Sequence, residues 1–250
     1  MLAVYVNCLT VILGTILGCV FSKKISSDLS KVISTGAGVV TLVLGIEMAL
    51  KYQNIIILAF SMILGGILGT WLNIDGAILS FGNFLEKHFY HKKIATVSKD
   101  LPQETNQNQA KSSFAYAFLN ASVLFCVGAM SIIGSIKAGI EKDYTIIFTK
   151  SILDGFLAIV FASSMGIGTG FSSLSILIYQ GSLTLLAKLL EPYVTETLLH
   201  ELSAIGGALI VMIGTNLIGF TKIKTANYLP ALVLSVVFVF LIPLITGCNL

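Results

Sequence analysis

The chain has 250 residues, of which 56% are hydrophobic and only 11% are charged. Soluble domains carry about 25% charged residues, so this composition excludes an ordinary soluble protein and indicates a membrane protein. The net charge of +3 is too small to indicate nucleic acid as a partner. All basic residues are lysines, and they lie mainly between apolar runs, as is typical of loops that flank membrane helices.

Hydrophobic windows predict the fold class. A membrane-spanning helix needs about 20 apolar residues, and windows of this length fall at 2–22, 32–50, 54–74, 114–136, 146–165, 172–190, 202–220 and 228–247. We therefore expect an all-α, polytopic bundle of about eight transmembrane helices. Between the fifth and sixth windows, the uncharged stretch 166–171 predicts either a tight turn or a helix broken within the membrane.

The lysines indicate an orientation for this bundle. One side of the predicted topology carries Lys23, Lys24, Lys31, Lys87, Lys92, Lys93, Lys99, Lys111, Lys222 and Lys224. The other side carries Lys51, Lys137, Lys142, Lys150 and Lys188. Because cytoplasmic loops are enriched in lysine, we expect the first group to be cytoplasmic and both termini to be outside.

The region between the third and fourth windows divides the chain. We assign 1–75 to N-terminal membrane helices, 76–111 to a surface helix with a polar cytoplasmic linker, and 112–250 to C-terminal membrane helices. The apolar spacing of residues 78–89 suits a helix lying on the membrane surface. The following TVSKDLPQETNQNQAKSS is polar and contains a proline, which is typical of a flexible linker.

A short pattern predicts an inverted repeat. Spaced positions in the second window recur at a constant offset in the seventh, pairing Ser34, Gly38, Gly45 and Glu47 with Ser203, Gly207, Gly214 and Asn216. These two helices would cross the membrane in opposite directions, an arrangement common in secondary transporters. Identities among small residues also arise by chance.

Asp154 is the main candidate for chemistry, because it stands inside the apolar segment KSILDGFLAIVFASS. In a helix that begins near Ile146, its carboxylate would lie roughly 13 Å deep at ~1.5 Å per residue. A charge there costs about 2.5–3.5 kcal/mol on insertion scales, so it should face protein or water. Lys150 lies one turn earlier on the same face. Asp154 is therefore either an ion or proton site, or the partner of Lys150 in a pair that only orients the helix.

A polar stripe in the sixth window supplies further candidates. Ser172, Ser175, Tyr179 and Ser182 fall on one helical face, with Gln180 beside them. Such a stripe lines a wet cavity or forms interhelical hydrogen bonds worth about 0.6 kcal/mol each. Oxygen ligands suit hard cations. The predicted substrate or ion-binding residues are Asp154, Ser175, Tyr179, Gln180, Ser182, Asn120, Ser163 and Ser164.

Patterns typical of enzymes, metal sites or cofactor sites are missing from the sequence. The four cysteines are scattered and form no C-x-x-C pair. The glycines of 166–170 lack the βαβ unit of a nucleotide site. Glu86, His88 and His91 suit a solvated helix face much better than a metal site. We therefore expect neither enzymatic activity nor a metal or cofactor.

Several segments resemble a known family. They are KSILDGFLAIVFASSMGIGTGFS, NASVLFCVGAMSIIG, YQGSLTLLA, ELSAIGG and KIKTANYLP. They resemble a family of bacterial membrane proteins that is filed as a domain of unknown function and typified by the YdfK and YqgA proteins. The resemblance covers nearly the whole chain. It implies a polytopic protein of the inner (plasma) membrane, sometimes labelled a possible transporter, without an established substrate.

The residues favour a transporter or channel for a small solute or cation, with Asp154 as the charged ligand or proton carrier. The alternative is a non-transporting membrane sensor or assembly protein, in which Asp154 only pairs with Lys150. The expected partners are the lipid bilayer and a small cation or solute. The sequence leaves the oligomeric state open, a homo-oligomer included.

Overall fold

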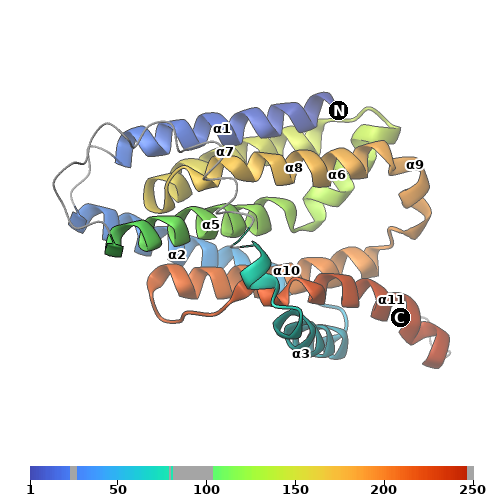
Figure 1. Cartoon of the computed structure of the whole chain (residues 1–250). Helices are drawn as coiled ribbons and strands as arrows, with labels where there is room; N and C mark the ends of the chain where they lie inside the picture. The colour runs from blue at the N-terminus through green and yellow to red at the C-terminus, as the bar shows by residue number, and fades with distance from the viewer. Residues whose placement is uncertain (23–26, 79, 81–103, 247–250) are drawn as a thin grey trace.

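The structure is a computed structural model that describes residues 1–22, 27–78, 80 and 104–246, with the backbone alone for 27, 30, 104–113 and 242–246. Within these residues it is helical and contains no strand, which confirms the predicted all-α class (Figure 1). The helices are α1 (Leu2–Ser22), α2 (Ser27–Ala49), α3 (Ile55–Trp71), α5 (Glu104–Cys126), α6 (Ala129–Ile140), α7 (Thr145–Met165), α8 (Gly168–Leu185), α9 (Ala187–Leu190), α10 (Glu196–Ile218) and α11 (Pro230–Thr246), with 3₁₀ turns η2 (Glu191–Tyr193) and η3 (Thr225–Tyr228).

The described helices account for the predicted membrane spans. Four are long and apolar enough to cross a membrane alone: α1, α2 from Lys31 onward, α7 and α10. Two bent pairs, α5 with α6 and α8 with α9 and η2, reach the required length together. The remaining apolar helices, α3 and η3 with α11, are shorter. Each predicted window thus coincides with a helix or a bent pair, which is compatible with about eight spans.

The fourth window is broken, although the sequence predicted one continuous helix there. α5 and α6 meet at an angle of 63°. Gly128, between them, has φ 131° and ψ 149°, a conformation that is accessible to glycine and strained for other residues. The Ser131 hydroxyl donates to the Phe125 carbonyl at 3.2 Å and satisfies one acceptor that the break leaves free.

The stretch between the fifth and sixth windows is a tight turn, the first of the two predicted alternatives. The Gly166 N–H donates to the Ala162 carbonyl, and Gly166 has φ 88°. The N–H groups of Thr169 and Gly170 then donate to the carbonyls of Gly166 and Ile167, at 3.3 and 3.0 Å. Since these two carbonyls are used in the first turn of α8, the turn does not release them toward a site within the bundle.

The predicted linker is partly helical. α5 begins at Glu104, so the backbone of 104–113 is helical where the sequence analysis expected a flexible segment. The glutamate, glutamines, alanine and lysine of this stretch are good helix formers, which explains the difference. The rest of the linker and most of the predicted surface helix, 81–103, lie outside the described residues.

The helices pack as two groups (Figure 1). The first group contains α1, α5, α6, α7 and α8, and the second contains α2, α3, α10 and α11. α2 packing against α7 is the main connection between them, and α10 makes smaller contacts with α5 and α6. Each group therefore combines helices from both sides of the linker.

Glycines set the closest helix contacts and reveal helix direction. A Cβ on Gly14 would collide with the Gly155 carbonyl, and one on Gly18 with the Ile159 carbonyl. The later residue of α1 thus contacts the later residue of α7, so the two helices are parallel. They also approach closely, as the small residues at the contact predict. By the same argument α2 and α10 are antiparallel. Gly38 of α2 contacts Gly214 of α10, whereas the later Gly45 contacts the earlier Gly207.

Candidate functional site

Asp154 lies inside the first helix group, on the face of α7 that meets α1 and α8. Its residue is 4% exposed, and Lys150 is 6% exposed. The Lys150 ammonium is 2.5 Å from the Asp154 carboxylate, one helical turn away. The neighbouring Gly155 allows α1 to pack closely against α7 here, since its missing side chain leaves room for Thr10 of α1. The predicted Lys–Asp pair is therefore present and buried.

Two amide side chains extend the pair into a cluster of three helices. The Asn7 side-chain amide of α1 donates to the Asp154 carboxylate at 3.1 Å and to the Gln180 side-chain oxygen at 3.2 Å. Asn7 and Gln180 are fully buried. We call Asn7, Lys150, Asp154 and Gln180 the polar centre. It joins α1, α7 and α8.

The polar centre contains polar atoms without partners. Asn7 Oδ1 and Gln180 Nε2 are buried and make no hydrogen bond within the described part of the chain. Leaving a buried polar group unpaired costs about 1–3 kcal/mol. The polar centre therefore has one unused hydrogen-bond acceptor and one unused donor close to the carboxylate. An ion pair that is only structural does not require these additional groups.

The lysine count places Lys150 on the outer side of the predicted bundle, but this residue does not lie in a loop. It lies within α7, where its ammonium is held by Asp154 instead of facing the membrane surface. Without it, the proposed outer side carries one lysine fewer. The charge asymmetry behind the predicted orientation is therefore larger than the sequence count indicated.

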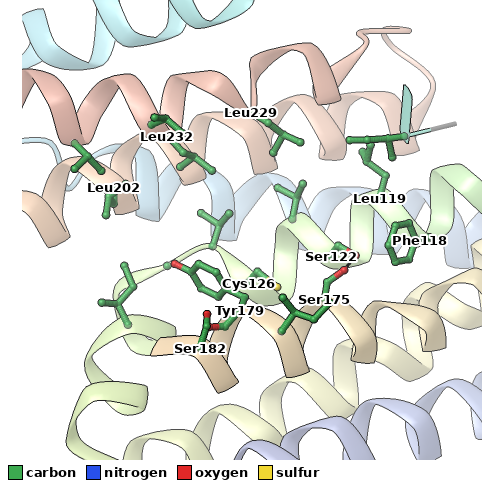
Figure 2. Close-up of a pocket in the computed structure, with 18 of the residues that line it drawn as sticks. Phe118, Leu119, Ser122, Cys126, Ser175, Tyr179, Ser182, Leu202, Leu229 and Leu232 are labelled. Atoms are coloured by element: carbon green, nitrogen blue, oxygen red, sulfur yellow. Dashed lines mark hydrogen bonds between the residues drawn. The ribbon is translucent and has the colours of Figure 1, made fainter. Parts of the chain in front are cut away.

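The predicted stripe on α8 divides between two environments. Gln180 joins the polar centre, whereas Ser175, Tyr179 and Ser182 line a cavity of about 930 Å³ whose wall does not include Asp154 (Figure 2). Ser175 also shares a 2.9 Å hydrogen bond with Ser122 of α5, and Ser182 donates to the Tyr179 carbonyl of its own helix at 2.8 Å. The stripe therefore serves both as cavity lining and as a contact between helices.

The other predicted ligands lie near the turn between α7 and α8. Ser163 and Ser164 donate to carbonyls of their own helix, the former to Val160 at 2.7 Å. Asn120 of α5 donates to the Met165 sulfur at 3.7 Å. Ser163 is nine residues beyond Asp154, or roughly 13 Å along the helix at ~1.5 Å per residue. The structure therefore does not bring these three residues to the polar centre.

Several buried polar residues were not among the predicted candidates, and Asn7 and Glu201 bond between helices. Asn7 stands within the apolar first window, and a polar side chain at that depth is the signal that could have identified it. Glu201 of α10 is fully buried and accepts hydrogen bonds from the N–H groups of Gln53 and Asn54, at 2.9 and 2.7 Å. These N–H groups precede α3, so Glu201 stabilises the start of that helix.

The described residues contain no group of three His, Cys, Asp or Glu side chains that could hold a metal ion. Glu86, His88 and His91, considered in the sequence analysis, lie outside the described residues. The chemistry of the polar centre is therefore that of one carboxylate, one ammonium group and two amides.

The fold and the polar centre define a multi-pass, α-helical membrane protein with an ion pair buried among its helices. The chain belongs to the family described as "Protein of unknown function (DUF554)", whose model matches residues 2–240. This confirms the family resemblance.

Two relatives extend over nearly the whole chain. The uncharacterized membrane protein YdfK of Bacillus subtilis (strain 168) is 30% identical over 240 residues, which cover 94% of each chain. The uncharacterized protein YqgA of Escherichia coli (strain K12) is 27% identical over 231 residues, which cover 92% of this chain and 93% of YqgA. No solved structure matches the chain. The name of YdfK supports membrane association.

Proposed function

We propose that the protein transports a small cation or solute across the bacterial inner membrane, as a transporter or channel, and that Asp154 binds the cation or proton. The observation that carries the proposal is the cluster around one buried carboxylate. Lys150 and Asn7 both donate to Asp154, and Asn7 also donates to Gln180, so the cluster draws on three helices. Ionisable groups within membrane helices are costly and mark ion pathways and proton relays.

The residues suggest how such a site works. When it is empty, Lys150 neutralises Asp154 and reduces the cost of a buried charge. An arriving cation or proton displaces the ammonium from the carboxylate. Asn7 Oδ1, which is unpaired in the structure, is an oxygen ligand beside the carboxylate. Lys150 then acts as an internal competitor for the ion.

The packing of α2 on α10 supports a transporter over other membrane proteins. The predicted repeat makes Gly38 equivalent to Gly207, and Gly45 equivalent to Gly214. In the structure Gly38 faces Gly214, and Gly45 faces Gly207. These reciprocal contacts are those expected of equivalent helices related by a two-fold axis. Inverted repeats of this kind place substrate and ion sites near the bilayer midplane, at the interface between the repeats.

The α1–α8 crossing fits the same relation. When the same sequence offset is applied to the other helices, α1 is equivalent to α8 and α9, and α3 is equivalent to η3 and α11. α1 and α8 are antiparallel, because Gly170 faces Thr15 whereas Gln180 contacts Asn7. The polar centre therefore lies where two equivalent helices would cross, which is the position of an ion site in an inverted-repeat transporter.

The alternative is a sensor or assembly protein in which the pair is structural. It is favoured by the direct Lys150–Asp154 contact, which already satisfies the charge, and by side chains that are only 8% and 6% exposed. In this case Asp154 would bind no ion, and its carboxyl group would be needed only to keep Lys150 paired.

Carbodiimide labelling tests ion binding directly. Dicyclohexylcarbodiimide modifies protonated carboxyl groups within membranes, and peptide mass spectrometry would identify the labelled residue in protein reconstituted in liposomes. We expect labelling of Asp154 that one of Na⁺, K⁺ or higher pH suppresses. Labelling should increase in Lys150→Met, which removes the competing ammonium. Labelling of Asp154 that no cation and no pH change affects would contradict the proposal.

A further inference from the structure

The cavity described above lies between the two helix groups. Its walls come mainly from α5, α6 and α8 of the first group and from α10 and α11 of the second, and Ala77 and Ile78, which follow α3, complete the lining (Figure 2). Its volume of about 930 Å³ falls within the range of small-molecule sites, which is about 300–1,000 Å³. Its position at the boundary between packed groups is also one at which ligand sites commonly occur.

The two walls differ in chemistry. The first group contributes apolar side chains such as Phe118 and Ile132 and, in addition, all the hydroxyl groups, from Ser122, Ser175, Tyr179 and Ser182. The second contributes aliphatic side chains, including Leu229 and Leu232 of the α11 region. None of the described residues that line the cavity is charged. An ion or a charged headgroup would lose its hydration there without gaining a counter-charge, so the cavity suits a neutral occupant.

Tyr179 offers a half-buried hydroxyl group to the cavity. Figure 2 shows its ring projecting from α8 into the space that faces α10 and α11. Its hydroxyl group donates no hydrogen bond to any residue in the described part of the chain. A tyrosine hydroxyl in such a setting ordinarily has a partner. Ser122 and Ser175 already bond to each other, which leaves Tyr179 to orient a ligand.

We propose that this cavity binds a neutral, single-chain amphipathic molecule, with its alkyl part against α11 and one hydroxyl or carbonyl group at Tyr179. A phospholipid fits less well, because its charged headgroup would meet no charged residue in the cavity wall. The proposal goes beyond the proposed function. α8 separates the cavity from the polar centre, with Tyr179 on the cavity side and Gln180 on the other.

Photolabelling tests the proposal in full-length protein reconstituted in phosphatidylcholine vesicles. The probe is a long-chain alcohol with a diazirine in mid-chain, and mass spectrometry locates the label. We expect saturable labelling of peptides from α8 and α11. Tyr179→Phe should weaken the apparent affinity roughly two- to ten-fold, the range expected for one hydrogen bond.

A matched pair of variants tests the location. Val233 lines the cavity and is 65% exposed, so Val233→Trp places a ring in the open space without displacing a buried side chain. Val43 of α2 is 62% exposed and is not among the cavity-lining residues, so Val43→Trp is the control. We expect the first variant to abolish saturable labelling and the second to leave it unchanged.

Three results would overturn the inference. The first is labelling that does not saturate, or that a diazirine phosphatidylcholine reproduces equally, since this shows lipid around the protein only. The second is equal labelling of the two tryptophan variants. The third is the absence of label from α8 and α11. The double variant Asp154→Asn with Lys150→Met, which leaves no unpaired charge, should leave labelling unchanged, so a failure of ion transport and a failure of this site are distinguishable.

Discussion

Replacing the members of the buried ion pair separates its structural role from its proposed functional role. Asp154→Asn leaves the Lys150 ammonium in a site where its side chain is 8% exposed. Removing one partner of a buried pair costs about 3–5 kcal/mol, because the remaining charge is uncompensated. Lys150→Met should cost a similar amount. In the double variant no charge remains, so we expect stability to recover to within about 1 kcal/mol of the unmodified protein.

The exposed pair of Glu47 and Lys51 is a matched control. It has the same four-residue separation, from the last turn of α2 into the turn that follows, and an N–O distance of 3.3 Å, but its side chains are 65% and 47% exposed. Its coupling energy should be about 0.3–0.5 kcal/mol. Both cycles would be measured as free energies of unfolding in lipid nanodiscs. A buried pair whose coupling energy is no larger than that of the exposed pair would refute the reasoning.

Two further substitutions test the fold, and a labelling experiment tests the topology. Gly14→Leu should destabilise the protein by several kcal/mol, because its side chain would meet the Gly155 backbone; Gly36→Leu, at a position with open space, is the control in the same unfolding assay. Gly166→Ala should cost about 1–2 kcal/mol for its φ of 88° alone, since no atom lies within 4 Å of the added carbon; an unchanged unfolding free energy would contradict this. Cysteines at Gln107 and at the C-terminus should react with impermeant reagents from opposite sides of the membrane, and labelling from one side would overturn the predicted topology.

Much of the architecture could be predicted because membrane spans depend on local sequence. Window length identified the approximate positions of the spans, and spacing within one helix identified Lys150 as a partner of Asp154. The break at Gly128 could not be predicted in the same way. Its positive φ depends on how α5 and α6 pack against the other helices, and a lone glycine in an apolar window more often marks a close helix contact.

The assembly of the site depends on contacts that a single sequence does not reveal. Asn7 and Asp154 are 147 residues apart, and only the packing of α1 on α7 brings them together. The α8 stripe shows the same limit. Tyr179 and Gln180 are about 100° apart around a helix, so their spacing predicts that the two side chains point in different directions. The spacing does not show that Gln180 joins the polar centre and that Tyr179 lines a cavity.

The central claim is that the Asp154 carboxylate carries a cation or proton. The most direct measurement is flux into proteoliposomes, with Na⁺, K⁺ and protons tested in turn under an imposed gradient, for the unmodified protein, Asp154→Asn and the exposed control Asp28→Asn. We expect flux of at least one ion in the unmodified protein and in the Asp28 variant, and its loss in Asp154→Asn and in the stable double variant with Lys150→Met. Unchanged flux in folded Asp154→Asn would contradict the role assigned to this carboxylate.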